Sequence, residues 1–226
     1  LTVAPKENIY VVTNDAYQSL VQEQLPELTN AQILTEPMRK NTAPCIAYAS
    51  AKIMAINPNA TLIVAPSDHL ILKEDKFKET VEIAIKNATS DERLVTIGIK
   101  PTRPDTGYGY IEFSESREIF PGQITPVKHF REKPSREMAE LFLKSGNYYW
   151  NSGIFIWQAK TILNALEKFK PKLHKLFAGD LSFYNTTSEK ESINKCFKTC
   201  EDISIDFAVM ENAKNTDVVL ANFDWS

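Results

Sequence analysis

The polar sequence Ser67-Asp68-His69 follows an apolar run at residues 62–65. That run predicts a buried strand, which places the Asp68 carboxylate at a strand end. Such a carboxylate is a typical Mg²⁺ ligand, because Mg²⁺ takes one or two carboxylates and completes its shell with water and phosphate oxygens. Helix capping is the ordinary alternative, but the next helical pattern begins only near Asp75. We therefore expect a metal-binding role for Asp68, and a hydrogen-bonding or core role for His69.

The elements that must position these residues alternate in the first half of the chain between short apolar runs and helical patterns. Strands that are apolar on both faces and separated by helices are typical of a parallel sheet covered on both sides. Ligands of such sheets bind beyond the carboxyl ends of the strands, where polar clusters lie at 36–42, 67–69 and 106–110. The expected strands are 8–13, 32–36, 61–66 and 94–99. Three helices are expected: one capped by Asn14 or Asp15, one from a cap at Thr42 to Asn57, and one from about Asp75 to Ala88.

The second half has longer apolar patterns that suggest antiparallel strands. The fold class that follows is α/β, with a mixed, mainly parallel sheet flanked by helices. The expected strands are 108–113, 124–130, 152–157 and 217–225, and the expected helices are one from Ser135 to Gly146 and one from Ile162 to Phe177 with a break at Pro171.

Composition excludes several classes of protein. The chain has 226 residues, of which 43% are apolar and 24% charged, as in an ordinary globular protein. Its net charge of −3 argues against a nucleic-acid partner, and no apolar run approaches the roughly 18–20 residues of a membrane span. Cys45, Cys196 and Cys200 lack the partners of a zinc site, so we expect reduced thiols and a cytoplasmic protein.

Five segments in order carry a family resemblance over nearly the whole chain. They are TEPMRKNTAPCIAYASAKI from residue 35, VAPSDHLI from 64, GIKPTRPDTGYGYIEF from 98, FREKPSREMAELFLKSGNYYWNSGIFIW from 130, and SIDFAVME from 204. Together they resemble the bacterial mannose-1-phosphate guanylyltransferases. The resemblance implies a Rossmann-like, GT-A-like nucleotidyltransferase fold. It also implies a Mg²⁺-dependent reaction of GTP with mannose 1-phosphate that gives GDP-mannose and pyrophosphate.

Two departures from the family pattern concern the chain ends. The family begins with a Gly-rich loop of the kind GGxGxRLWPLS, whereas this chain has seven glycines, none of them adjacent. The family also continues beyond Trp225-Ser226 with an aspartate that helps to bind metal. We therefore expect a single catalytic domain over 1–226 that is truncated at both ends and inactive alone. Its nucleotide-binding half would span about 1–105 and its sugar-phosphate-binding half about 106–226.

The resemblance assigns four residues to the sugar phosphate. Lys133 would neutralise its phosphate, as a catalytic residue together with Asp68, although a solvated surface role is the usual fate of a lysine. Glu132 would accept from sugar hydroxyls, and Asn151 would offer both a donor and an acceptor. Gly109 would let a backbone N–H approach the sugar, with a bulge or turn as an equally good explanation from sequence alone.

Three residues are assigned to the nucleotide besides Asp68. Glu36 could accept from the paired N1–H and 2-amino groups of guanine, which adenine and uracil lack; a surface glutamate is the alternative. Asn41 and Thr42 lie at a helix start, where amide N–H groups could meet base, ribose or phosphate.

Other functions stay open at this point. The alternatives are another sugar-1-phosphate nucleotidyltransferase, a non-catalytic nucleotide-sugar-binding regulatory protein, and a dinucleotide-dependent dehydrogenase, which lacks support because no G-x-G-x-x-G occurs. A homodimer is also left open. Asp206 and Glu211 lie on a predicted helix, five positions apart, which does not place them on one face; their roles stay unassigned.

Overall fold

The computed structural model describes residues 3–113 and 120–225. A two-stranded parallel sheet comes first, in which β1 (Val11–Asn14) pairs with β2 (Ile33–Glu36). The helix α1 (Gln18–Gln24) connects them. Three 3₁₀ helices accompany this sheet, at Lys6–Asn8, Asp15–Tyr17 and Asn30–Gln32.

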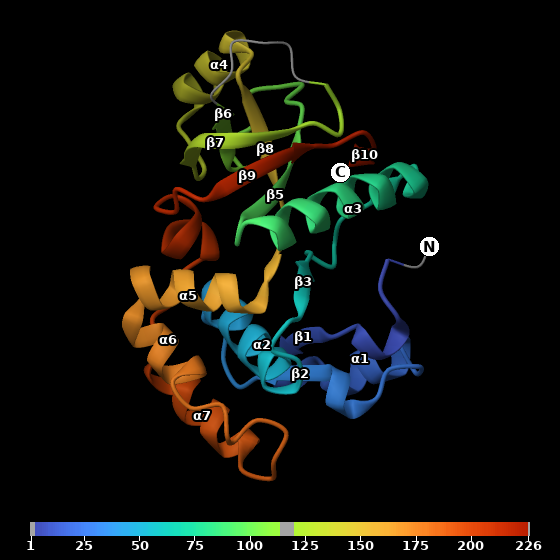
Figure 1. The fold of residues 1–226 in the computed structure, drawn as a ribbon, viewed down its shortest axis with the longest axis vertical. Coiled ribbons are helices and arrows are strands. Elements are labelled where there is room, and N and C mark those ends of the chain that lie inside the picture. The colour runs from blue at the N-terminus through green and yellow to red at the C-terminus, as the bar shows by residue number, and fades with distance from the viewer. Residues whose placement is uncertain (1–2, 114–119, 226) are drawn as a thin grey trace.

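A six-stranded sheet forms the centre of the molecule, in the order β3-β8-β5-β9-β7-β6 (Figure 1). Its pairings make β3, β5, β9 and β6 run in one direction and β8 and β7 in the other. The strands are β3 (Thr61–Val64), β5 (Leu94–Ile99), β6 (Tyr110–Phe113), β7 (Ile124–Arg131), β8 (Tyr148–Gln158) and β9 (Thr216–Leu220).

The α/β class with a mixed sheet flanked by helices is confirmed, but β3 and β5 of the first half are not neighbours in one parallel sheet. Within the six-stranded sheet only β5 and β9 are parallel neighbours. The reason is that β8 lies between β3 and β5 and pairs antiparallel with both. Local sequence patterns could not reveal this, because β8 comes from a distant part of the chain.

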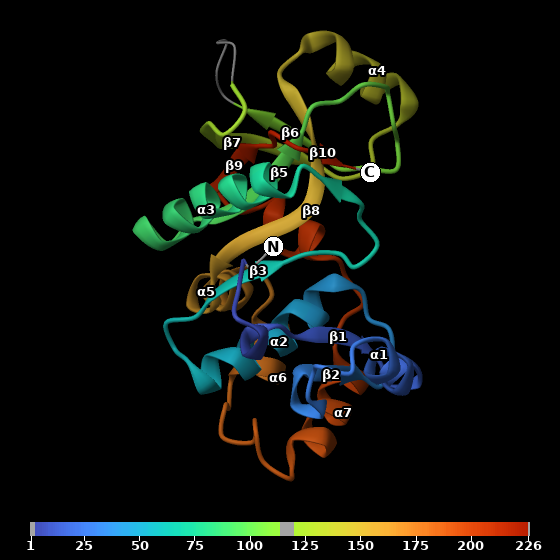
Figure 2. The ribbon, with the colours of Figure 1, turned by 90° about the vertical axis from the view of Figure 1, so that its right-hand side faces the viewer.

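Helices cover both faces of the six-stranded sheet (Figures 1 and 2). Side chains alternate along a strand, so Ile154 and Ile156 of β8 pack towards α3 (Glu74–Ser90). Phe155 and Trp157 face the opposite way, into the larger core. That core is formed with four helices, which are α2 (Thr42–Ile56), α5 (Ala159–Phe169), α6 (Pro171–Ala178) and α7 (Glu189–Thr199). The two expected halves of the chain therefore share one core.

Most expected helices are confirmed, with small differences at their ends. Ser135 caps α4 (Arg136–Ser145) and Gly146 ends it, as expected. The cap of α2 is Asn41, whose side chain accepts from the Thr42 N–H, so the expected cap at Thr42 is wrong by one residue. The helix α7 was not expected; it buries Ile193, Cys196 and Phe197.

The expected last strand is split in two. After β9, a second short strand, β10 (Asp224–Trp225), pairs antiparallel with β4 (Ile71–Leu72), which follows the Asp68 loop. Within the described part of the chain, every helix is too short or too polar to cross a membrane.

Candidate functional site

Three of the four expected sugar-phosphate residues lie close together: Gly109 just before β6, Glu132 just after β7, and Asn151 within β8. An ideal Cβ on Gly109 would lie 2.6 Å from Glu132 Oε2 and 3.5 Å from Asn151 Cβ. The Asn151 N–H donates to the Gly109 carbonyl at 2.8 Å. A side chain at position 109 would therefore displace the Glu132 carboxylate from its present place. All three residues lie side by side next to β6, β7 and β8.

The Asn151 side chain is held by several partners, and only 8% of the residue is exposed. Its Nδ2 donates to Asp206 Oδ1 at 3.1 Å. Its Oδ1 lies 2.9 Å from Thr96 Oγ1 and 3.2 Å from the Gly153 N–H. The expectation that Asn151 offers a sugar both a donor and an acceptor stays a prediction, because Thr96 and the Gly153 N–H already approach its oxygen.

Charged groups surround Glu132, whose side chain is 12% exposed. Burial, and then the charge of Asp206, raise its pKa to about 7, while Lys133 opposes the shift and Glu211 adds to it. Lys133 Nζ lies 3.8 Å from Glu132 Oε1, and its side chain is 65% exposed. Lys133 also has a positive φ of 43°, a backbone conformation that is uncommon for residues other than glycine.

Asp206 and Glu211, which sequence patterns left unassigned, both reach this cluster. Asp206 begins a π-helical turn, Asp206–Met210, a feature frequent at functional sites. Burial raises the pKa of Asp206. Glu211 Oε1 accepts from the Glu132 N–H at 3.3 Å. The bonds that bring these residues together join segments far apart in sequence, so spacing alone could not find them.

Glu36 lies at the end of β2 with its carboxyl group turned inwards. Its Oε1 is buried, with no hydrogen-bond partner among the described residues. Burial raises the pKa of Glu36 to about 7, opposed by a hydrogen bond with the Cys45 thiol. A surface role for Glu36 is excluded. A buried carboxylate oxygen without a partner calls for a donor from elsewhere.

The start of α2 offers fewer free amides than expected. The Thr42 N–H bonds to the Asn41 side chain, the Ala43 N–H bonds to the Ile203 carbonyl at 3.1 Å, and Pro44 has none. The Thr42 hydroxyl accepts from the Ile205 N–H at 2.9 Å. These bonds dock the segment before Asp206 onto α2, and they leave neither the Thr42 nor the Ala43 N–H free for a nucleotide.

Asp68 is exposed in the turn that follows β3. A Cβ on Gly153 of β8 would lie 3.4 Å from Pro66 Cγ, so the start of this turn lies close to Asn151. No hydrogen bond or ion pair joins Asp68 to Lys133 among the described residues, and neither residue lines two of the best-formed pockets there. A shared cleft between them stays a prediction.

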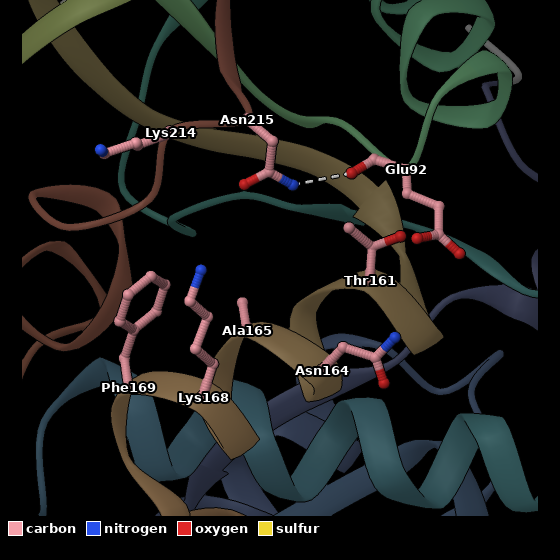
Figure 3. Close-up of a pocket in the computed structure, with 8 residues that line it drawn as sticks. All are labelled: Glu92, Thr161, Asn164, Ala165, Lys168, Phe169, Lys214 and Asn215. Atoms are coloured by element: carbon pink, nitrogen blue, oxygen red, sulfur yellow. Dashed lines mark hydrogen bonds between the residues drawn. The ribbon is translucent and has the colours of Figure 1, made fainter.

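The larger of these two pockets lies elsewhere, at the starts of β5 and β9. It has a volume of about 370 Å³, and residues of α5 line one side of it. Figure 3 shows the Asn215 side chain bonded to the Glu92 carbonyl, at 2.8 Å, along its upper edge. None of the sequence-predicted site residues lines it. The lining residues are Glu92, Thr161, Asn164, Ala165, Lys168, Phe169, Lys214 and Asn215.

Comparison with known sequences places the chain in a family. Residues 2–203 match the pattern described as nucleotidyl transferase. The chain belongs to the nucleotidyl transferase family. It is 42% identical, over 96% of its length, to mannose-1-phosphate guanylyltransferase of Sinorhizobium fredii, of which it covers 42%. The chain thus spans less than half the length of the curated relatives it matches.

Two solved structures of this nucleotidyl transferase fold are similar over nearly the whole chain. One, described as mannose-1-phosphate geranyltransferase from Thermus thermophilus, superposes with a TM-score of 0.85 at 26% identity, covering 99% of this chain and 62% of that one. The other, described as mannose-6-phosphate isomerase from Helicobacter pylori, has a TM-score of 0.81 at 33% identity, covering 97% and 85%.

Proposed function

We propose that this chain is the nucleotidyltransferase part of a mannose-1-phosphate guanylyltransferase, which joins GTP and mannose 1-phosphate into GDP-mannose and pyrophosphate. The observation that carries the proposal is the close contact of Gly109 with both Glu132 and Asn151. The similarity to a relative of that name supports it. Three free thiols, at Cys45, Cys196 and Cys200, agree with a cytoplasmic location.

The reaction forms one bond and breaks one. A phosphate oxygen of mannose 1-phosphate attacks the α-phosphorus of GTP, and the bond from that phosphorus to the β-phosphate oxygen breaks, which releases pyrophosphate. Both reactants are anions, so charge repulsion and misalignment make up much of the barrier. Lys133 would hold the sugar phosphate, while Glu132 and Asn151 hold its sugar. Glu36 would bind the guanine edge, and the side chains of Asn41 and Thr42 would line the nucleotide.

Asp68 suits a Mg²⁺ ion that is shared with phosphates. It supplies one exposed, hard oxygen ligand, and the described residues contain no group of three or more His, Cys, Asp or Glu able to form an all-protein cage. Mg²⁺ usually takes few carboxylates and completes its shell with water and phosphate. Once bound, the ion would shield the charge between the reacting phosphates.

The test is turnover by the protein that carries this chain. We expect GDP-mannose and pyrophosphate to form in equal amounts from GTP and mannose 1-phosphate. Asp68→Asn should abolish turnover with little change in thermal stability, because Asp68 is exposed. Asp75→Asn changes an equally exposed aspartate of α3 and should leave the rate unchanged. A wild-type rate for Asp68→Asn would remove its metal-binding role.

The name of the Helicobacter pylori structure raises a second candidate function, isomerisation of mannose 6-phosphate. The two activities differ in their need for a nucleotide. If the protein converts mannose 6-phosphate into fructose 6-phosphate without GTP, and the Glu36→Gln variant does so equally well, the isomerase function replaces the transferase one.

A further inference from the structure

The hydrogen bonds of the Asn151 side chain leave one of its amide hydrogens without a partner among the described residues. Its oxygen faces the Gly153 N–H and the Thr96 hydroxyl, whose single hydrogen is shared between Asn151 and the Ile154 carbonyl. One of its two amide hydrogens goes to Asp206. An ionised carboxylate can only accept, and a backbone N–H can only donate, so Asp206 and Gly153 fix the same orientation of the amide. The second amide hydrogen has no hydrogen-bond partner among the described residues.

Glu132 lies beside Asn151 and, unlike the Asn151 amide hydrogen, is a hydrogen-bond acceptor. Its carboxylate lies against Gly109, and the nearest cation among the described residues, Lys133, is 3.8 Å away, beyond a hydrogen bond. When ionised, Glu132 can only accept. A sugar hydroxyl placed between the two side chains would accept from Asn151 and donate to Glu132.

We propose that Asp206 is a positioning residue, which holds Asn151 as a hydrogen-bond donor opposite the acceptor Glu132. The pair then selects one sugar hydroxyl that accepts from Asn151 and donates to Glu132. This inference rests on the proposed function, since its ligand is the sugar of the sugar 1-phosphate. A buried polar pair of this kind rejects a sugar that lacks the hydroxyl, because both protein groups would be left without a partner.

Asp206 also acts on Glu132 through its charge. The charged groups that face Glu132 are Lys133 beside it, and Asp206 and Glu211 from the π-helical turn and its end. Because the pKa of Glu132 is about 7, its acceptor form appears as the pH rises through that value. Removing the Asp206 charge lowers the pKa of Glu132, so sugar binding should then develop at lower pH.

The first experiment measures mannose 1-phosphate binding by calorimetry between about pH 5.5 and about pH 8.5. For Asp206→Asn we expect about three- to tenfold weaker binding at the alkaline end and a binding midpoint lower by about half a pH unit or more. Asp202→Asn makes the same change at an exposed site nearby and should match the wild type. If Asp206→Asn fails to fold, Asp206→Gln takes its place, with Asp206→Glu expected to keep the wild-type midpoint.

The second experiment uses monodeoxy and monofluoro analogues of mannose 1-phosphate. At one ring position the wild type should bind both analogues weakly, because neither can donate to Glu132. In Asp206→Asn this selectivity should shrink several-fold. If the variant instead loses the same factor for every analogue and keeps the wild-type midpoint, Asp206 has only a structural role and the inference is overturned.

The results separate this inference from the proposed function. Wild-type binding of mannose 1-phosphate with an unchanged midpoint in Asp206→Asn overturns the inference alone. Binding of a different sugar 1-phosphate, with the midpoint shifted in the variant, supports the inference and overturns the choice of mannose. No binding of any sugar phosphate by the wild type overturns both.

Discussion

The indole N–H of Trp225 donates to Nδ1 of His69 at 3.1 Å. Their rings meet edge to face, 5.1 Å apart. Burial lowers the pKa of His69, which favours the neutral imidazole that can accept at Nδ1. Since His69 directly follows Asp68, the last described strand fixes the loop that carries the proposed metal ligand.

Trp225 continues into a row of aromatic rings. Tyr108 packs between Trp225 and Trp150, 5.2 Å from each, and Tyr108 precedes Gly109. The row therefore connects the Asp68 loop to the sugar cluster by packed side chains.

Trp225→Phe tests this connection. Phenylalanine keeps the ring contacts but loses the N–H, a hydrogen bond worth about 0.5–1.5 kcal/mol. We expect a higher Mg²⁺ concentration for half-maximal turnover, with the KM for mannose 1-phosphate unchanged. Phe223→Leu, a change in the α3 core that leaves the His69 contact intact, should not move the Mg²⁺ requirement. An unchanged Mg²⁺ requirement in Trp225→Phe would show that Trp225 does not hold the loop.

Gly109→Ala tests the close approach of Glu132. Its Cβ would lie 2.6 Å from Glu132 Oε2, too close for a real contact, so the carboxylate must move. We expect the KM for mannose 1-phosphate to rise about tenfold or more, with the KM for GTP nearly unchanged. In the control Gly107→Ala, the new Cβ would meet only Asp105 Oδ1, at 3.1 Å. Equal effects of both variants would mean that general loop strain, rather than Glu132, is responsible.

Local patterns predicted the elements well because they depend on local chemistry. Gly146, with a positive φ of 76°, ends α4 as a glycine is expected to do, and Pro171 starts α6 at its first position. Patterns could not order the strands, since the place of β8 is decided by packing on both of its faces. They missed α7 because its buried apolar residues, Ile193, Cys196 and Phe197, are few among many polar residues.

The site was predictable only in part. Gly109, Glu132 and Asn151 come together as the family resemblance implied, whereas Asp206 joins them through a hydrogen bond across 55 positions of sequence. The hydrogen bonds that reach the Asn151 oxygen come from Thr96 and Gly153, and neither residue has a local signal for that role.

A buried ion pair offers a test of how α7 is attached to α2. Lys52 Nζ lies 2.7 Å from Glu189 Oε2, with side chains 8% and 13% exposed. Glu189 also accepts from the Tyr48 hydroxyl at 3.0 Å. Lys52→Met leaves a buried carboxylate unpaired, so we expect the free energy of unfolding to fall by about 3–5 kcal/mol, measured by urea denaturation.

Two comparisons check that the loss of stability in Lys52→Met comes from the unpaired charge of Glu189. Lys52→Met combined with Glu189→Gln should recover more than half of the loss, because the glutamine remains an acceptor without a charge. Lys195→Met breaks the exposed pair of Lys195 and Glu191 and should cost less than about 1 kcal/mol. If the double variant is as unstable as Lys52→Met, lost packing rather than the unpaired charge explains the result.

Glu36 should make the stability of the protein depend on pH. Its pKa of about 7 in the folded chain exceeds the ordinary value of 4.5, so the folded chain holds the proton more tightly than the unfolded chain. The stabilising contribution is then complete below about pH 4.5 and is lost as the pH rises through about 7. Glu36→Gln, a neutral side chain of the same shape, should be more stable than the wild type at about pH 8 and nearly equal to it at about pH 5.

The measurement is the difference in the free energy of unfolding between wild type and variant at each pH. Taking the difference cancels the other titrating groups, including Glu132, whose pKa is also about 7. The exposed Glu23, changed to glutamine, should follow the wild type at both pH values. A Glu36→Gln variant that tracks the wild type across the range would mean that the pKa of Glu36 is not raised in the folded chain, so that the carboxylate is already ionised above its ordinary pKa. The cost of burying its charge would then be absent, and with it the physical reason to expect a guanine donor at this carboxylate.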